Sequence, residues 1–361
     1  MSQSRRRFSQ ADYDVLPHRL VLVRHAQSEG NVDMAKYGST PDHMVALTDL
    51  GRKQAIDAGI ALRAHLKAAH PSKLHPPRVY IMTSPYARTL ETTDMMLNAF
   101  DDSEVMGVRS VVQLREQDFG NFQDAQRIKH DLNERLRFGR FWFRFPNGES
   151  GADVYDRLSM FEDKLTRDML LARFADTSVV LVTHGLTLRI LLMKWFHWTV
   201  EELLQVYNPH NCDPIFMVKL PWEDVQVMQS NGEGWVHLKQ AYCLCPSSVA
   251  KMRNVTPRMA SYYGRAAAGK ETGERISAKA AWQVSRGIVQ PGRERDTQEA
   301  LAYLSGLSSV WGEADPHVQA HMLRAKAALL GSDEERWFVT VDDGDFWAGE
   351  SGRSQPRIDD N

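Results

Sequence analysis

Residues 20–31 read LVLVRHAQSEGN, and this stretch decides the fold. The apolar run 20–23 has the length and composition of a buried strand, and it passes directly into Arg24 and His25. A reactive side chain at the carboxyl end of such a strand opens into the crevice where α/β sheets bind their ligands. The guanidinium of Arg24 matches a phosphate in a two-pronged contact. The stretch therefore predicts an α/β protein with an anion site beside His25.

Two further apolar runs end in the same kind of chemistry. Residues 79–82 lead into a predicted helix start that places Arg88 in the first turn, where free backbone N–H groups already favour an anion. Residues 179–182 lead to His184 and Gly185, and a helical pattern follows them. Three strands thus each end in a phosphate-compatible side chain. This recurrence predicts a phosphate site where the carboxyl ends of the strands meet.

These residues resemble the signature of the histidine phosphatase (phosphoglycerate-mutase-like) superfamily. The resemblance implies that His25 is the nucleophile and forms a covalent phosphohistidine. It also implies that Arg24, Arg88 and His184 surround the phosphate. Asn31 falls on the asparagine that closes the first motif, where it binds a phosphate oxygen. Neither a metal nor another cofactor is implied.

The proton donor is predicted from a second block. Residues 114–120, LREQDFG, resemble the acid segment of the superfamily, which places the donor at Glu116. From the residues alone, Glu116 and Asp118 are both candidate acids. We also expect two substrate contacts, at Gly185 and at Arg144, which lies in a segment rich in arginine and aromatic residues.

Helical patterns alternate with these strands at 47–55, 154–174 and 186–196. The alternation predicts a three-layer α/β/α fold with a mainly parallel sheet, like that of phosphoglycerate mutases, followed by a C-terminal extension. After residue 245 the composition shifts to Ala, Arg, Ser and Gly with little apolar periodicity, which is typical of a flexible linker. We expect an N-terminal extension at residues 1–17 and a catalytic domain at 18–245. A linker at 246–296 and a C-terminal appendage of unknown role at 297–361 would follow.

Longer sequence blocks indicate which group within the superfamily the chain resembles. Blocks at 40–43, 115–122 and 137–146 resemble a plant and fungal group of phosphoglycerate-mutase-like proteins and broad-range acid phosphatases. The proline-rich segment with which glycolytic mutases grip phosphoglycerate is not found. Residues 135–145 instead alternate arginine with Phe and Trp, which fits either a buried aromatic face or a lid over the phosphate site.

The leading hypothesis is therefore a phosphatase for small phosphate monoesters, without a metal. One alternative is a phosphoglycerate mutase or bisphosphoglycerate phosphatase. Another is a non-catalytic module that binds phosphorylated ligands.

Composition limits the partners and the compartment. The 361 residues carry a net charge of −2, which does not favour a nucleic-acid partner. No apolar run approaches the length of a membrane span, and the basic N-terminus lacks the apolar region of a secretory signal. Three cysteines do not suggest a disulfide framework, so we expect the cytoplasm, with a plastid as the alternative. The sequence identifies no protein partner for the C-terminal extension.

Overall fold

A six-stranded sheet forms the centre of the molecule, with the strand order β3-β2-β4-β1-β5-β6. The computed structural model describes residues 8–70, 76–120, 130–131, 134–135, 138–231 and 238–261. The strands are β1 (Arg19–Arg24), β2 (Arg78–Thr83), β3 (Val105–Ser110), β4 (Thr177–Thr183), β5 (Ile215–Lys219) and β6 (Tyr242–Leu244). The first four strands run parallel, while β5 is antiparallel to β1 and β6 is antiparallel to β5. The expected mainly parallel sheet is confirmed, and its antiparallel pairings lie at one edge.

The central strands are apolar along their whole length because both faces of the sheet are covered. All seven residues of β4 are buried, and so are the four inner residues of β1. Such strands show continuous apolar runs instead of alternation, since neither side faces water. This is why residues 20–23 and 179–182 could be recognised as strands from their sequence.

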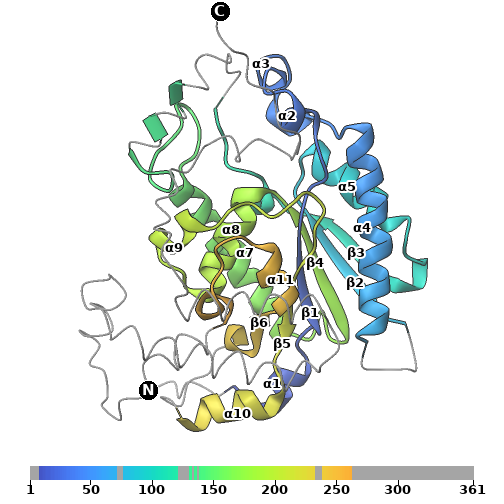
Figure 1. Cartoon of the computed structure of the whole chain (residues 1–361). Coiled ribbons are helices and arrows are strands. Elements are labelled where there is room, and N and C mark those ends of the chain that lie inside the picture. Colours follow the sequence, from blue (N-terminus) through green and yellow to red (C-terminus); the bar gives the residue numbers. More distant parts are fainter. Residues whose placement is uncertain are drawn as a thin grey trace, which may run out of the picture.

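Helices cover the two faces of the sheet (Figure 1). One face carries the pair α4 and α5, and the other carries the pair α7 and α8. The long helices are α4 (Asp49–Ala68), α5 (Ala87–Leu97), α7 (Gly151–Leu170) and α8 (Gly185–Phe196). This arrangement confirms the predicted α/β/α layers. The helices expected at 47–55, 154–174 and 186–196 are found as α4, α7 and α8.

Shorter helices lie in the connections and at the ends of the described chain. They are α1 (Gln10–Asp14), α2 (Glu29–Val32), α3 (Lys36–Ser39), α9 (Val200–Gln205), α10 (Trp222–Asn231) and α11 (Pro246–Lys251). Five 3₁₀ turns are described at Asp42–Met44, Asp102–Glu104, Val112–Leu114, Leu238–Ala241 and Pro257–Ala260. Figure 1 shows α2 and α3 at the opposite end of the molecule from α1 and α10. Within the described ranges, no helix is both long enough and apolar enough to cross a membrane.

The packed domain is longer at both ends than the predicted catalytic domain. Before residue 18, Leu16 is fully buried in the core, and the Tyr13 hydroxyl donates a hydrogen bond of 2.6 Å to the Leu220 carbonyl. After residue 245, α11 and the last 3₁₀ turn bury Val249 and Met259. Residues 246–261 therefore belong to the domain, which differs from the linker expected there. Short irregular elements bury scattered apolar residues without a period, so sequence periodicity does not reveal them. Residues 1–7 and 262–361, with most of the expected linker and the appendage, lie outside the described residues.

Candidate active site

Three strand ends meet at one edge of the sheet. β4 lies between β1 and β2, and all three run in the same direction. His25 follows β1, His184 follows β4, and Arg88 lies in the first turn of α5 after β2. The ring centroids of His25 and His184 are 5.2 Å apart. The structure therefore brings together three residues that the sequence had placed on separate strands.

His25 is held as a neutral imidazole with a defined tautomer. Its side chain is buried, and Nδ1 lies 2.7 Å from the carbonyl oxygen of the adjacent residue Ala26. A carbonyl oxygen only accepts hydrogen bonds, so Nδ1 carries the proton and Nε2 keeps its lone pair. Burial, and then the positive charges of Arg88 and Arg24, hold the pKa of His25 well below its usual value of 6.5. His25 can therefore act as a nucleophile at neutral and mildly acidic pH.

Arg24 and the backbone of His25 are held by the loop before β5. Arg24 Nη1 donates to the Pro209 carbonyl at 3.0 Å, and Asn211 Nδ2 donates to the His25 carbonyl at 2.6 Å. The Cys212 N–H donates to the Arg24 carbonyl at 3.0 Å. These contacts cross nearly 190 residues of sequence, so tertiary structure alone brings the loop to the motif.

Arg88 is buried and is gripped on one side by Asp42. Arg88 Nη1 donates to the Asp42 carbonyl oxygen at 2.6 Å and forms an ion pair of 2.8 Å with Asp42 Oδ1. The guanidinium also lies 4.9 Å from the centroid of the Tyr86 ring. Although burial opposes the charged form, Asp42 raises the pKa of Arg88. Arg88 is therefore a fixed positive charge.

His184 offers a hydrogen-bonding atom that has no partner in the described part of the chain. Its Nε2 lies 2.8 Å from Ser84 Oγ, while the buried Nδ1 bonds to no other described group. When the Ser84 hydroxyl donates to Nε2, Nδ1 carries the proton and becomes a donor for an anion. Burial and the nearby Arg88 hold the pKa of His184 well below 6.5. Ser84 thus supports His184. The helix start predicted from Ser84 and Pro85 is found slightly later, since α5 begins at Ala87 with Tyr86 as its N-cap residue.

Asn31 is oriented by its neighbour in α2. Its Oδ1 accepts hydrogen bonds from the Ser28 N–H at 3.0 Å and from Ser28 Oγ at 3.1 Å. With the oxygen occupied in this way, the Nδ2 group of Asn31 is the part left to serve as a donor. Asn31 also lines the pocket. It can therefore donate to an anion there, as the sequence predicted.

Glu116 is held at the N-terminus of α8 by four hydrogen bonds. Its Oε1 accepts from the N–H groups of Gln117 and Thr187 and from the Thr187 hydroxyl, at 3.1, 3.2 and 3.0 Å. Its Oε2 accepts only one of the hydrogen bonds found, from the Leu186 N–H at 3.2 Å. Oε2 is therefore the oxygen that can carry a proton and donate it to a ligand.

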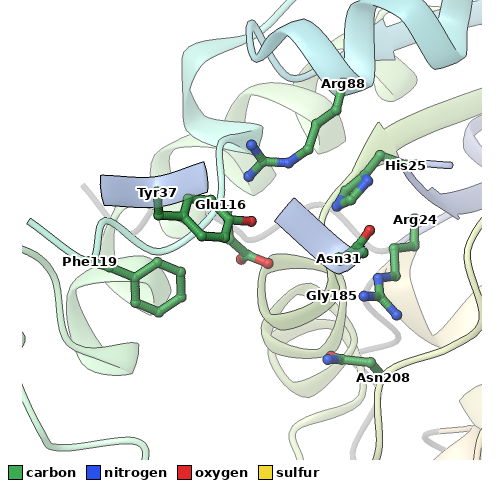
Figure 2. Close-up of a pocket in the computed structure, with 9 residues that line it drawn as sticks. All are labelled: Arg24, His25, Asn31, Tyr37, Arg88, Glu116, Phe119, Gly185 and Asn208. Carbon is green, nitrogen blue, oxygen red and sulfur yellow. The ribbon is translucent and has the colours of Figure 1, made fainter. Parts of the chain in front are cut away.

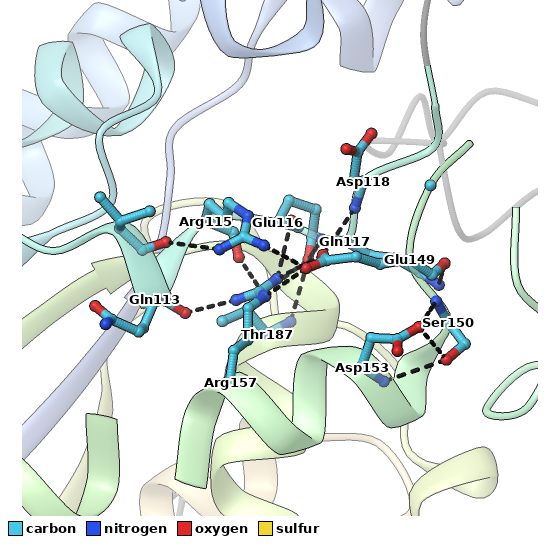
Figure 3. A network of polar contacts seen from close by, with 12 residues as sticks. Gln113, Arg115, Glu116, Gln117, Asp118, Glu149, Ser150, Asp153, Arg157 and Thr187 are labelled. Atoms are coloured by element: carbon cyan, nitrogen blue, oxygen red, sulfur yellow. Dashed lines mark hydrogen bonds and ion pairs between the residues drawn. The ribbon is translucent and has the colours of Figure 1, made fainter. Parts of the chain in front are cut away.

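A polar network fixes the backbone around Glu116 (Figure 3). Arg157 of α7 donates to the carbonyl oxygens of Gln113 and Glu116, at 2.5 and 3.0 Å. The same guanidinium contacts both carboxylate oxygens of Glu149, at 3.0 and 3.1 Å, and Arg115 also pairs with Glu149. Because a buried charge is costly unless it is paired, this network stabilises one conformation of the segment.

Five of these residues line one pocket, namely Arg24, His25, Asn31, Arg88 and Glu116 (Figure 2). His184 is not among the lining residues and packs behind the pocket against His25. Arg24, His25, Asn31 and Arg88 surround its inner part, and Glu116 lies across it from His25. The remaining walls come from Tyr37, Phe119, Gly185 and Asn208. Positive charges and donors therefore concentrate at the inner end, and the carboxyl group and aromatic rings lie toward the other.

Comparison with known proteins agrees with this geometry. The profile of the family described as "Histidine phosphatase superfamily (branch 1)" matches residues 20–216, which is more than half of the chain. The chain belongs to the histidine phosphatase superfamily. The resemblance stated from the sequence motifs is thereby confirmed.

Relatives within the superfamily differ in how they are named. The chain is 47% identical over 207 residues to "Phosphoglycerate mutase-like protein AT74" of Arabidopsis thaliana, a match that covers 56% of this chain and 65% of that protein. It therefore spans less than two thirds of the length of this relative. The chain is 30% identical over 279 residues to "Broad-range acid phosphatase DET1" of Saccharomyces cerevisiae, covering 54% of this chain and 83% of that protein.

Two of the predicted acidic and basic residues lie outside the pocket of this histidine phosphatase. Asp118 is exposed, and its Oδ1 accepts a hydrogen bond from the Gly120 N–H at 2.8 Å. Arg144 is 61% exposed and pairs with Asp153 at 2.6 Å. Neither residue is among those that line the pocket, so the expected substrate contact at Arg144 is not found in this structure. In the described part of the segment 135–145, burial does not separate arginine from aromatic residues. Arg135, Phe141 and Phe145 are buried, whereas Phe138, Trp142 and Arg144 are exposed.

Several pocket residues were not predicted from the sequence. Phe119 lies within a quoted block but has no role assigned from the sequence, and Tyr37 and Asn208 carry no sequence signal at all. Asp42, which lies outside the pocket lining and pairs with Arg88, was likewise not predicted. Gly185 has a steric reason for its identity, since an added Cβ would lie 2.5 Å from Asn208 Oδ1. A glycine there lets the start of α8 approach the loop that carries Asn208.

Proposed function

We propose that this histidine phosphatase hydrolyses phosphate monoesters without a metal, through a phosphohistidine on His25 and with Glu116 as the proton donor. The observation that carries the proposal is the tautomer of His25. Its Nδ1 is occupied by the Ala26 carbonyl, and Nε2 keeps a lone pair within a ring of phosphate-binding groups. A neutral imidazole with that lone pair is the form required of a nucleophile.

In the first step, His25 Nε2 attacks the phosphorus atom and a P–N bond forms. The P–O bond to the leaving group breaks, and the departing oxygen takes the proton from Glu116. In the second step, ionised Glu116 removes a proton from a water molecule, which attacks the phosphorus. The P–N bond then breaks, its electron pair returns to Nε2, and inorganic phosphate leaves.

The positively charged side chains and hydrogen-bond donors of the site would stabilise the negative charge on the phosphoryl group during its transfer. Arg24, Arg88 and the Nδ1 group of His184 can bind its equatorial oxygens, together with Asn31. Arg88 and His184 are buried, Arg24 and Asn31 are half-buried, and all four are already held by hydrogen bonds within the protein, so they need little reorganisation during the reaction. Fixed guanidinium groups can thus supply the charge stabilisation that a metal ion supplies in other phosphatases.

The relative named as a broad-range acid phosphatase supports a phosphatase, while the name of the Arabidopsis relative is mutase-like, so the choice between the two rests on the outer pocket. The outer pocket supports a broad choice of leaving groups, because Tyr37 and Phe119 offer ring faces there instead of additional cations.

The test is phosphate release from p-nitrophenyl phosphate in the presence of EDTA, for wild type, His25→Ala and His65→Ala. His65 lies near the far end of α4, where it stacks on Phe216, and serves as the matched control. We expect wild type and His65→Ala to be active and His25→Ala to lose at least about a thousandfold in kcat. Mass spectrometry of acid-labile phosphate on the peptide with His25 would identify the intermediate. Activity lost on adding EDTA, or retained by His25→Ala, would contradict the proposal.

A further inference from the structure

Asp42 places a second carboxylate beside the phosphate-binding groups, in a position that the chemistry above does not use. It begins the 3₁₀ turn Asp42–Met44 between α3 and α4. Its Oδ1 lies 2.8 Å from Arg88 Nη1, and its carbonyl oxygen accepts from the same Nη1 at 2.6 Å. One nitrogen of Arg88 is therefore held twice by a single residue.

The ion pair is well shielded from water. The side chains of Arg88 and Asp42 are 3% and 21% exposed. Neither carboxylate oxygen of Asp42 has another hydrogen-bond partner in the described part of the chain. Burial raises the pKa of this carboxyl group, and the charge of Arg88 counteracts that effect. A carboxylate kept in this position without other partners acts chiefly on Arg88.

The turn that carries Asp42 is itself anchored. The Met44 N–H donates to the Pro41 carbonyl at 2.8 Å, and the Val45 N–H donates to the Asp42 carbonyl at 3.3 Å. Val45 and Leu47 are each only 1% exposed, so the chain after the turn is fixed in the core. Asp42 is thus a rigid partner and not a side chain on a free loop.

The other edge of the guanidinium faces the site. Arg88 Nε is buried and has no hydrogen-bond partner among the described residues. Figure 2 shows Arg88 reaching into the pocket between His25 and the side of Tyr37. A guanidinium held at one nitrogen can present its remaining N–H groups as a fork to phosphate oxygens.

We propose that Asp42 is a positioning residue for the phosphatase reaction: it holds Arg88 Nη1 so that the opposite edge of the guanidinium meets the substrate phosphate. The proposal rests on the proposed function of the pocket as a phosphate site. It assigns to the block 40–43 a role that its sequence did not reveal.

Two substitutions separate position from charge. Asp42→Asn keeps an acceptor oxygen at the same distance but removes the charge, and Asp42→Glu keeps the charge but displaces it by one methylene. We expect Asp42→Asn to bind inorganic phosphate within about threefold of wild type, or more tightly. We expect Asp42→Glu to weaken phosphate binding and to raise KM for p-nitrophenyl phosphate by about tenfold, the factor that corresponds to one misplaced charged hydrogen bond. Asp49→Ala, which removes an exposed ion pair with Arg52, is the matched control.

A double-mutant cycle tests whether Asp42 acts through Arg88. In an Arg88→Ala background, Asp42→Glu should change kcat/KM by less than about twofold, because the group that it positions is absent. Isothermal titration with inorganic phosphate gives the affinity, and thermal unfolding reports on folding. The proposal is overturned if Asp42→Glu binds phosphate like wild type, or if its effect persists in the Arg88→Ala background.

The same measurements separate this proposal from the proposed function. A wild type that neither binds phosphate nor releases it from p-nitrophenyl phosphate rejects the phosphatase function. A wild type that does both, together with unchanged binding in Asp42→Glu, rejects only the role of Asp42.

Discussion

The two halves of the pocket are built in different ways. The half that we propose binds phosphate, called the phosphate half here, is lined by His25 and Arg88 and supported by His184, which lies against His25. All three sit at or just after the ends of buried parallel strands. The leaving-group half consists of Glu116 and Phe119 in a loop, held by contacts to α7 and α8. Strand ends in one sheet are positioned by backbone pairing, whereas the loop depends on side-chain hydrogen bonds. Substitutions in the phosphate half should therefore impair the hydrolysis of every ester, whereas the effect of substitutions in the loop half should depend on the leaving group.

The largest expected difference between the halves concerns the leaving group. Glu116→Gln should reduce kcat roughly a hundredfold for an alkyl phosphate such as glycerol phosphate, because the alkoxide needs a proton. The same variant should lose only a few-fold with p-nitrophenyl phosphate, whose leaving group departs as an anion. His25→Ala should instead fail with both esters. Initial rates on the two esters measure this contrast.

Asp118→Asn is the matched control for Glu116→Gln. Asp118 was the other candidate acid, and its side chain bonds to the Gly120 N–H outside the pocket lining. We expect its kcat to stay within about twofold of wild type on both esters. The assignment of Glu116 as proton donor would be contradicted if Glu116→Gln lost the same factor in kcat with both esters. It would also be contradicted if the loss in Asp118→Asn depended on the leaving group.

The second prediction concerns the network that holds the loop half. Arg157→Ala removes one of two cationic partners of Glu149, which keeps Arg115, and leaves two backbone carbonyl oxygens without this donor. The free energy of unfolding should therefore fall by about 2 kcal/mol. Because the backbone of Glu116 is released, kcat should fall more for the alkyl ester than for p-nitrophenyl phosphate. Urea unfolding and the two assays measure both effects. Arg167→Ala, an exposed residue of the same helix, should change neither quantity.

The third prediction concerns the pH dependence of the phosphate half. In the folded protein the pKa values of His25 and His184 lie well below 6.5, chiefly because both side chains are buried. Near and below pH 6.5, the unfolded chain therefore binds more protons at these histidines than the folded protein does. Their contribution to the free energy of unfolding is fully present above pH 6.5 and is lost as the pH falls below it.

His184→Gln should make that loss smaller. The free energy of unfolding, measured by urea titration at about pH 7.5 and 5.5, should decline less in this variant than in wild type. The exposed His43 provides the control, and His43→Gln should decline as wild type does. A steeper decline in His184→Gln would mean that His184 is protonated in the folded protein.

The smallest expected effect is at Arg144, the predicted substrate contact that lies outside the pocket lining. Its ion pair with Asp153 is largely exposed, so Arg144→Ala should lower the free energy of unfolding by at most ~0.5 kcal/mol. Its kcat/KM on both esters should match that of wild type. A tenfold loss of activity would show that Arg144 contacts the substrate, as in the lid interpretation of residues 135–145.

Much of the fold followed from local patterns. The apolar runs that form β1, β2 and β4 could be recognised because strands buried on both faces are continuously apolar, and the helical pattern that begins α4 could be recognised from its periodicity. The boundary at residue 245 was set too early, since α11 and the turn at 257–260 pack without a regular apolar period. The expected linker beyond residue 261 and the appendage lie outside the described residues.

The sequence by itself placed phosphate-compatible side chains at the strand ends, namely Arg24, His25, Arg88 and His184, and the family resemblance added Glu116 as the predicted proton donor. These residues carry a local signal because each one follows a strand directly or lies in a recognisable block. Only the tertiary structure decided that Asp42 grips Arg88, that the Pro209–Cys212 loop supports His25, and that Tyr37 and Asn208 line the pocket. The physical reason is that hydrogen bonds and ion pairs join groups far apart in the chain, and nothing in the residues nearby records which partner each will meet.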